Sequence, residues 1–332
     1  APLEASIAMA IAARVQCDRI NDAPPAALAE GTSVRGGASV LRDQAACPFR
    51  AFAIHRLGAE GLEAPRAQPD AMARGNVLHR ALSLLWRELQ DREGTDRADV
   101  GAVVDAVVDA ALSEAQRAHP LSFPGRLAEL ERARLIRVLN AWLTVERGRE
   151  DFAVEGNEIA RQVDVGGLAM RLRLDRVDRL HDGTAALIDY KSGEARPAAM
   201  LGERPDEPQL PLYFATSDDM VSAVAFARVK RGSALGFAGF SAADALLPGV
   251  KPIEQQNAFK CAGYESWDVL TARWDETVTR LARAFLRGDA EIDPKNDGLA
   301  CQRCDLHALC RIAEHGGSAR LNADEDEEGV EA

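Results

Sequence analysis

The sequence predicts an α+β fold, a three-layer α/β/α-like core in which helices pack on the faces of one mixed sheet. Three observations predict it. Apolar residues recur at helical spacing up to about residue 148, and they alternate at a period of two between about 157 and 191. A helix, a strand and a long helix then follow before residue 288. This order is typical of a sheet with helices packed on it.

The first half of the chain is expected to be helical. A turn at 35–37 leads into a helical pattern over 39–55, and Gly75 opens a second helix, which is marked by leucines at helical spacing. Two amphipathic helices follow at roughly 99–118 and 124–148. Together they predict a large helical part, from 38 to 150, ahead of the sheet.

The second half is expected to supply the sheet and its remaining helices. Gly166-Gly167 is a hairpin signal between two alternating segments, and a third, nearly all apolar strand ends at Lys191. A helix is expected near Pro208, and a long helix is expected to stop at Gly288. The predicted strands are 157–165, 168–180, 184–191 and 221–230.

Composition and charge restrict the class of protein. Hydrophobic residues make up 47% of the 332 residues, and no apolar run is long enough for a membrane span, so we expect no membrane partner. The six cysteines are too sparse for a disulfide scaffold, and three of them lie within ten residues, so we expect a reducing, cytoplasmic setting. The net charge of −12 lies partly in the acidic tail at 319–332, which we expect to be disordered.

We expect a single domain over 33–318, after an N-terminal segment at 1–32 that is partly ordered. Its sheet core would span 151–235, and a C-terminal helix with a cysteine-rich segment would span 265–312. Because the chain begins with Ala rather than Met, we expect it to be a piece of a longer protein.

The sharpest local motif is the Asp-x-Lys at the end of the strand 184–191. Side chains alternate across a strand, so Asp189 and Lys191 share one face while Ile188 and Tyr190 share the other. A carboxylate beside an ammonium suits a divalent cation with a water or phosphate next to it. The alternative is a solvent-facing ion pair at the strand end, which contributes little.

The preceding strand adds carboxylates that favour a cation site over a surface ion pair. A meander places Asp175 beside Asp189, and a carboxylate in an apolar run is costly unless something compensates it. Glu158 lies on the strand before, so several carboxylates and one lysine converge on the sheet edge. This pattern predicts a metal-dependent phosphodiesterase, whereas Asp178 is expected to pair with Arg176 or Arg179 in a structural role.

Three of the six cysteines follow metal-ligand spacing. Cys301, Cys304 and Cys310 form C-x2-C-x5-C, which is an incomplete site that needs a fourth ligand. Spacing leaves the fourth ligand open between four residues and does not separate an iron–sulfur cluster from zinc. The candidates are Cys17, Cys47, Cys261 and His307.

The ordered motifs resemble the PD-(D/E)XK nucleases, and several match the RecB/AddB branch. A strand with Asp175 precedes the strand with Asp189-x-Lys191, the segment 74–79 looks like that branch's motif with a histidine, and 207–213 looks like its Gln-x-x-x-Tyr helix. The resemblance runs from about residue 33 to about 312 and implies a restriction-endonuclease-like mixed sheet with a large helical insertion.

The resemblance also assigns roles. Asp175 and Asp189 would bind Mg²⁺ or Mn²⁺, with His79 as a further ligand and Glu158 as a ligand or supporting carboxylate. Lys191 would orient the attacking water and stabilise charge on the scissile phosphate. The alternative for His79 is an ordinary histidine held by its helix.

Two further assignments come from the same resemblance. Gln209 and Tyr213, one helical turn apart, would position Lys191 or the DNA phosphate, with core packing as the alternative for Tyr213. Among the open cysteine ligands the resemblance selects Cys47, which would complete a [4Fe-4S] cluster as a structural clamp, with Zn²⁺ as the alternative.

The implied function is a metal-dependent DNA nuclease, exonucleolytic on single strands, within a DNA repair and recombination helicase–nuclease. Its partners would be DNA and a helicase domain or subunit. One alternative is a catalytically silent DNA-binding or structural module, which the presence of Asp175, Asp189 and Lys191 disfavours. Another is a stand-alone exonuclease similar to the CRISPR-adaptation nucleases.

Overall fold

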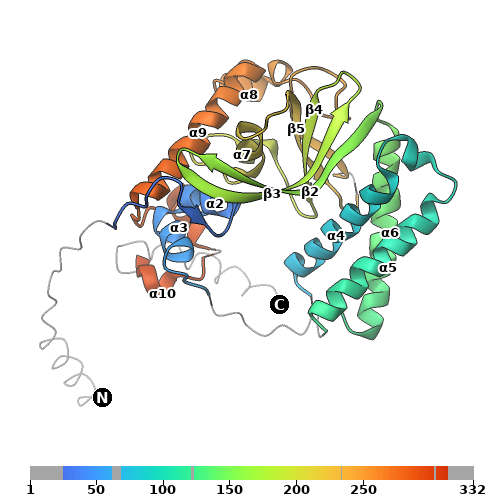
Figure 1. Ribbon diagram of the computed structural model, residues 1–332, viewed down its shortest axis with the longest axis horizontal. Coiled ribbons are helices and arrows are strands. Elements are labelled where there is room, and N and C mark those ends of the chain that lie inside the picture. The colour runs from blue at the N-terminus through green and yellow to red at the C-terminus, as the bar shows by residue number, and fades with distance from the viewer. Residues whose placement is uncertain (1–24, 62–68, 121–122, 233, 303, 313–332) are drawn as a thin grey trace, which may run out of the picture.

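The structure, a computed structural model, describes residues 25–61, 69–120, 123–232, 234–302 and 304–312. Its strands form one mixed sheet with helices on both faces (Figure 1). The expected α+β class and the three layers are confirmed. Cys17, the tail at 319–332 and most of the expected N-terminal segment lie outside the described residues.

The sheet has the strand order β1-β3-β4-β5-β6, and β2 also pairs with β3. The predicted meander β2-β3-β4 is antiparallel, and β4 and β5 run parallel with helix α7 (Gln209–Ala215) in the connection between them. The strands are β1 (Ser33–Val34), β2 (Phe152–Val165), β3 (Leu168–Leu180), β4 (Ala185–Lys191), β5 (Val221–Arg228) and β6 (Gly236–Ser241).

One face of the sheet packs against three long helices, drawn in teal and green in Figure 1: α4 (Ala71–Leu89), α5 (Val100–Ala118) and α6 (Gly125–Arg147). Their apolar stripes, including Trp86 and Trp142, enclose a first core together with Ile188 and Tyr190 of β4. Burial of such large side chains contributes about 1.5–3 kcal/mol each. These helices are the expected helical part.

The other face packs against α2 (Ala38–Ala46), α7 and α9 (Trp267–Arg287). This second core contains Leu187 of β4, Phe226 of β5, and Trp274 and Phe285 of α9. As predicted, α9 ends at Gly288, which has a left-handed φ of 89°. Alternate residues of β4 therefore enter different cores.

Three predicted boundaries were wrong. The expected helix over 39–55 is two helices, α2 and α3 (Pro48–His55), because Pro48 lacks an N–H and forces the preceding Cys47 into an extended conformation. Helix α4 begins at Ala71, after Asp70 caps it, rather than at Gly75. Strand β2 begins at Phe152 rather than at 157.

Short elements connect this framework, and β1 and β6 were not predicted. Strand β1 is two residues long, and β6 contains two glycines, so neither carries a clear alternating pattern. The short helices are η1 (Glu93–Asp96), η2 (Pro197–Met200), η3 (Ile253–Gln255), α8 (Asn257–Cys261), η4 (Asn296–Cys301) and α10 (His307–Cys310).

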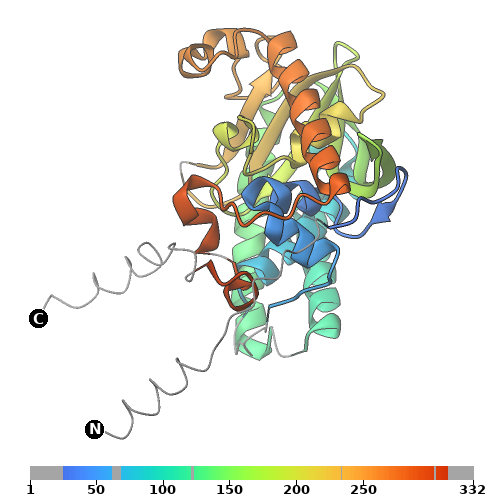
Figure 2. The ribbon, with the colours of Figure 1, turned by 90° about the vertical axis from the view of Figure 1, so that its left-hand side faces the viewer.

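Segments from opposite ends of the chain lie side by side, as Figure 2 shows for the red C-terminal segment and the blue helices α2 and α3. The Lys295 N–H donates to the Ala46 carbonyl at 2.8 Å, and the Phe49 N–H donates to the Glu291 carbonyl at 3.0 Å. Among the described residues, no helix is long and apolar enough to cross a membrane.

Candidate active site

The candidate site is built around an interruption in the pairing of β3. On one edge of β3, β1 pairs as far as Met170 and β4 pairs from Arg176 onward, so residues 171–175 have no strand partner on that edge. The N-terminus of α2 covers the first of them. A Cβ on Gly37 would lie 2.6 Å from the Arg171 carbonyl oxygen, and its φ is +54°, so this approach requires glycine.

Side chains satisfy the next backbone groups at this interruption. The Tyr213 hydroxyl donates to the Arg173 carbonyl, and Gln209 Nε2 donates to the same hydroxyl at 3.2 Å. The Asp175 carboxylate accepts from the Tyr190 N–H at 2.9 Å. Tyr213 therefore contacts β3 directly, and Gln209 contacts Tyr213. Burial raises the pKa of Tyr213. Their placement supports β3 beside the site.

The alternation of β3 changes at Asp175. In a regular strand, residues on one face are separated by a single residue. Leu174 and Val177 both face the second core although two residues separate them, and Arg176 enters the first core against Trp86. The pairing of β2 with β3 keeps its register here, with Asn157 opposite Arg176 and Ile159 opposite Leu174, and Glu158 between them has a positive φ of 55°. This local irregularity turns the Asp175 carboxylate toward the end of β4.

Strand β4 presents the Asp-x-Lys motif as predicted. Asp189 and Lys191 lie on the face of α7, and Ile188 and Tyr190 pack in the first core. Lys191 Nζ lies 3.0 Å from Asp189 Oδ2. The alternative of a solvent-facing ion pair does not hold for Asp189, which is only 2% exposed. Burial raises its pKa to about 7, against the opposing effect of Lys191.

His79 joins the site from α4. Its Nδ1 lies 3.3 Å from Asp175 Oδ2, and its ring packs edge-on against Tyr190. Burial lowers the pKa of His79, but the hydrogen bond and charge of Asp175 outweigh burial and raise it. Gly75, one turn earlier, passes Ser192 closely enough that a Cβ there would lie 3.6 Å from its hydroxyl. The first turns of α4 therefore lie against the end of β4.

Glu207 is a site residue to which the sequence analysis assigned no role. Its Oε2 lies 3.1 Å from Lys191 Nζ, so the ammonium bridges Asp189 and Glu207. Burial lowers the pKa of Lys191, but the two carboxylates outweigh burial and raise it. Glu207 lies in a loop just before α7. In the sequence, only its position two residues ahead of Gln209 could have indicated that it belongs to the site.

Two other carboxylates are held by arginines. Glu158 Oε1 lies 2.5 Å from Arg173 Nη2, so its side chain is paired beside the site. Asp178 is fully buried and pairs with Arg176, which confirms its predicted structural role.

The residues fit a divalent cation by their chemistry. Asp175 and Asp189 provide hard oxygen ligands, and buried Asp189 Oδ2 has the Lys191 ammonium 3.0 Å away. Two largely buried carboxylates close together are costly, and a divalent cation between them would offset their repulsion. In the described part of the chain, no three His, Cys, Asp or Glu side chains are already grouped as a metal site.

The four predicted cysteine ligands line one cavity beside α3. They are Cys47, Cys301, Cys304 and Cys310, and the cavity has a volume of about 20 Å³. Burial raises the pKa of the Cys301 thiol, and the other three thiols raise it further. Cys261 is exposed on α8, and His307 Nε2 is engaged with the Cys301 carbonyl at 2.9 Å. The arrangement therefore brings Cys47, rather than Cys261, to the C-terminal three.

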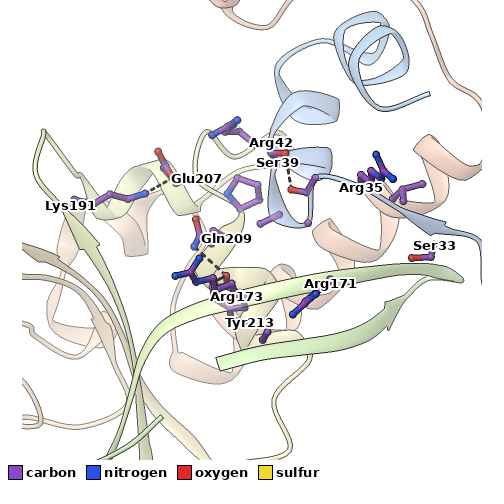
Figure 3. A pocket seen from close by; sticks show the side chains of 16 residues that line it. Ser33, Arg35, Ser39, Arg42, Arg171, Arg173, Lys191, Glu207, Gln209 and Tyr213 are labelled. Carbon is purple, nitrogen blue, oxygen red and sulfur yellow. Dashed lines mark hydrogen bonds and ion pairs between the residues drawn. The ribbon is translucent and has the colours of Figure 1, made fainter. Parts of the chain in front are cut away.

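A cleft of about 900 Å³ leads to Lys191 along the interruption in β3. Figure 3 shows Lys191 beside Glu207 at one end, Arg171 and Arg173 over β3, and Arg35 and Arg42 toward α2. Gln209 and Tyr213 line the cleft between them. The cleft therefore presents arginines along its walls and reaches Lys191, beside which Asp189 is buried.

Comparison with known proteins gives one family. The sequence model described as the PD-(D/E)XK nuclease superfamily matches residues 37–311, which is most of the chain. A solved structure titled "Crystal structure of SSO0001" is 12% identical, with a TM-score of 0.30, over 82% of this chain and 95% of that one. A search of the curated proteins finds no match.

Proposed function

The chain belongs to the PD-(D/E)XK nuclease superfamily, and on that basis we propose that it is a DNA nuclease that uses Mg²⁺ or Mn²⁺. The observation that carries the proposal is the meeting of Asp175, from the middle of β3, with Asp189 and Lys191 at the end of β4. Asp189 is buried there, and Lys191 Nζ lies 3.0 Å from its Oδ2. This is the arrangement that a cation and a phosphate need side by side.

Each side chain has a distinct part in phosphodiester hydrolysis. A bound divalent cation supplies charge stabilisation of a phosphoryl oxygen and a more acidic water. Asp175 and Asp189 would hold it, with His79 beside Asp175. The backbone N–H of Tyr190 fixes the orientation of the Asp175 carboxylate through their hydrogen bond.

Lys191 would act on the phosphate and the attacking water. Its ammonium lies between Asp189 and Glu207, which hold it at the cleft. From there it can donate to a water or to the scissile phosphate and stabilise the charge that develops. Glu207 is a positioning residue, because it contacts Lys191.

We infer further that the nuclease acts on single strands from an end and serves a repair helicase. The support is the resemblance of the segment around His79, of Gln209 with Tyr213, and of the split cysteines to the RecB/AddB branch. A catalytically silent module would not need the carboxylates that are present.

We also propose that the four cysteines bind a [4Fe-4S] cluster that clamps the C-terminal segment to α3. Their convergence on one cavity supports a thiolate site. A cavity of about 20 Å³ holds roughly one water, so a cluster requires 301–310 to lie farther from Cys47, whereas zinc needs less space. Metal analysis of anaerobically purified protein decides between them: about four irons per chain support the cluster, and one zinc refutes it. Cys47→Ala should lose the metal, and Cys261→Ala should keep it.

The nuclease proposal is tested with end-labelled single- and double-stranded DNA in Mg²⁺, Mn²⁺ or EDTA. We expect cleavage only with metal. Asp189→Asn, which keeps the shape of the side chain, should abolish it, whereas Asp218→Ala, a fully exposed position, should cleave as wild type. Cleavage by Asp189→Asn at the wild-type rate would contradict the site, and the absence of any cleavage by wild type would contradict the function.

A further inference from the structure

The walls of the cleft beside Lys191 carry four arginines. Arg171 and Arg173 project from β3, and Arg35 and Arg42 lie on the side of α2 (Figure 3). All four are exposed; for example, the Arg173 side chain is 64% exposed and the Arg42 side chain 51%. The net charge of the chain is −12, so this group of positive charges contrasts with the rest of the protein.

Three of these guanidinium groups are weakly neutralised, whereas Arg173 is paired with Glu158 at 2.5 Å. Within the described residues, Arg35 and Arg171 form no ion pair, and Arg42 lies 3.8 Å from Asp43, which is held more closely by Arg50 and His55. By contrast, Arg132 on α6 makes bonds of 2.6–3.1 Å to two carboxylates. The cleft thus retains donors for an external anion.

We propose that this cleft binds the phosphate backbone of one DNA strand and leads it to Lys191. The proposal rests on the proposed nuclease function and names the surface that carries its substrate. Guanidinium groups bind phosphates through charge-assisted hydrogen bonds. Arg171 and Arg173 are two residues apart on a strand, about 6.8 Å, so each serves a different phosphate.

The shape of the cleft favours one strand over a duplex. Its arginines lie on two sides, on β3 and beside α2, so they border a strand between them rather than lie on one element. Among the described residues that line the cleft, the one aromatic residue is Tyr213, which is buried and donates to the Arg173 carbonyl. Without an aromatic surface for base stacking, binding depends on phosphates and is independent of sequence.

The test compares two double variants that remove the same charge. Arg35→Gln with Arg171→Gln alters the cleft, and Arg117→Gln with Arg126→Gln alters exposed positions on α5 and α6. Binding of a fluorescent 15-nucleotide oligothymidylate is measured in EDTA, so that no cleavage occurs, across a series of salt concentrations. Circular dichroism and thermal melting verify that each variant is folded.

We expect the cleft variant to bind at least about tenfold more weakly, since a hydrogen bond to a charged group contributes about that factor. Its plot of log affinity against log salt should be less steep by about 1.4, or about 0.7 for each lost phosphate contact on a single strand. The α5/α6 variant should match wild type. Equal affinity and slope for all three proteins would overturn the proposal.

The two proposals fail separately. If wild type cleaves DNA with metal while the cleft variant binds normally, the nuclease stands and the cleft assignment is wrong. If binding depends on the cleft but no metal supports cleavage, the cleft stands and the nuclease is wrong. If a 15-base-pair duplex binds more tightly than the single strand and loses affinity equally in the cleft variant, the assignment to one strand is overturned.

Discussion

Replacing Arg176 by methionine tests how the sheet beneath the site is held. Arg176 is fully buried, and it lies 2.6 Å from Glu146 and 2.5 Å from Asp178. Its guanidinium also lies over the Trp86 ring, 3.8 Å from the centroid. Arg149 contacts both carboxylates as well, at 2.7 and 2.8 Å, so two cations and two anions form one buried group.

The expected cost follows from the charge left behind. Methionine fills much of the space, but Glu146 and Asp178 would then share one cation in a region with no exposed side chain. Removal of one partner from a buried ion pair costs about 3–5 kcal/mol. We expect the free energy of unfolding of Arg176→Met to fall by that amount, measured by urea denaturation with tryptophan fluorescence.

A second variant separates charge from packing. Asp178→Asn added to Arg176→Met leaves one anion, Glu146, with one cation, Arg149, at 2.7 Å, so part of the lost stability should return. Arg179→Met is the matched control on the same strand, because its pairs with Glu155 and Asp219 are at the surface. If the double variant is as unstable as Arg176→Met, uncompensated charge is not the cause.

Three further predictions concern the site. Tyr213→Phe leaves the Arg173 carbonyl without its donor, so it should cost about 1–3 kcal/mol in urea denaturation and slow cleavage; unchanged stability would contradict this role. Gly37→Ala places a Cβ 2.6 Å from the Arg171 carbonyl, so it should lower the melting temperature, whereas Gly183→Ala, with a similar φ and open space, should lower it less. Mn²⁺ at a hundredfold excess over its dissociation constant should stabilise wild type by about 2.7 kcal/mol, and thermal melting should show no such gain for Asp189→Asn.

The sequence predicts the parts of this fold whose periodicity is long and regular. Helix α9 and strands β3 and β4 were placed within a few residues, because apolar spacing and the stop at Gly288 mark them. The break at Cys47 was missed, although Pro48 signals it, because the apolar pattern continues across it. Strand β1 is held by β3, and its two residues carry no pattern of their own.

The sequence predicts the site residues whose side chains lie on regular strands. The shared face of Asp189 and Lys191 follows from the alternation of β4. The burial of Asp189 does not, because it depends on packing from helices distant in sequence. The direction of Asp175 depends on an irregularity opposite Glu158, and the contact of Glu207 with Lys191 depends on a loop. No periodic pattern in the sequence indicates the direction of Asp175 or the contact of Glu207 with Lys191.

The two cores differ in how much of the chain they need, which has a consequence for folding during synthesis. Among the described residues, the first core draws on residues between 73 and 250, whereas the second joins residues near 40 to α9, which ends at 287. Chains are made from the N-terminus, and contacts between distant residues form late because closing a long loop costs entropy. We therefore expect a nascent chain to bury the α4–α6 face of the sheet first. The face that carries Asp189 and Lys191 would close only after α9 leaves the ribosome, so the nuclease site would be assembled last.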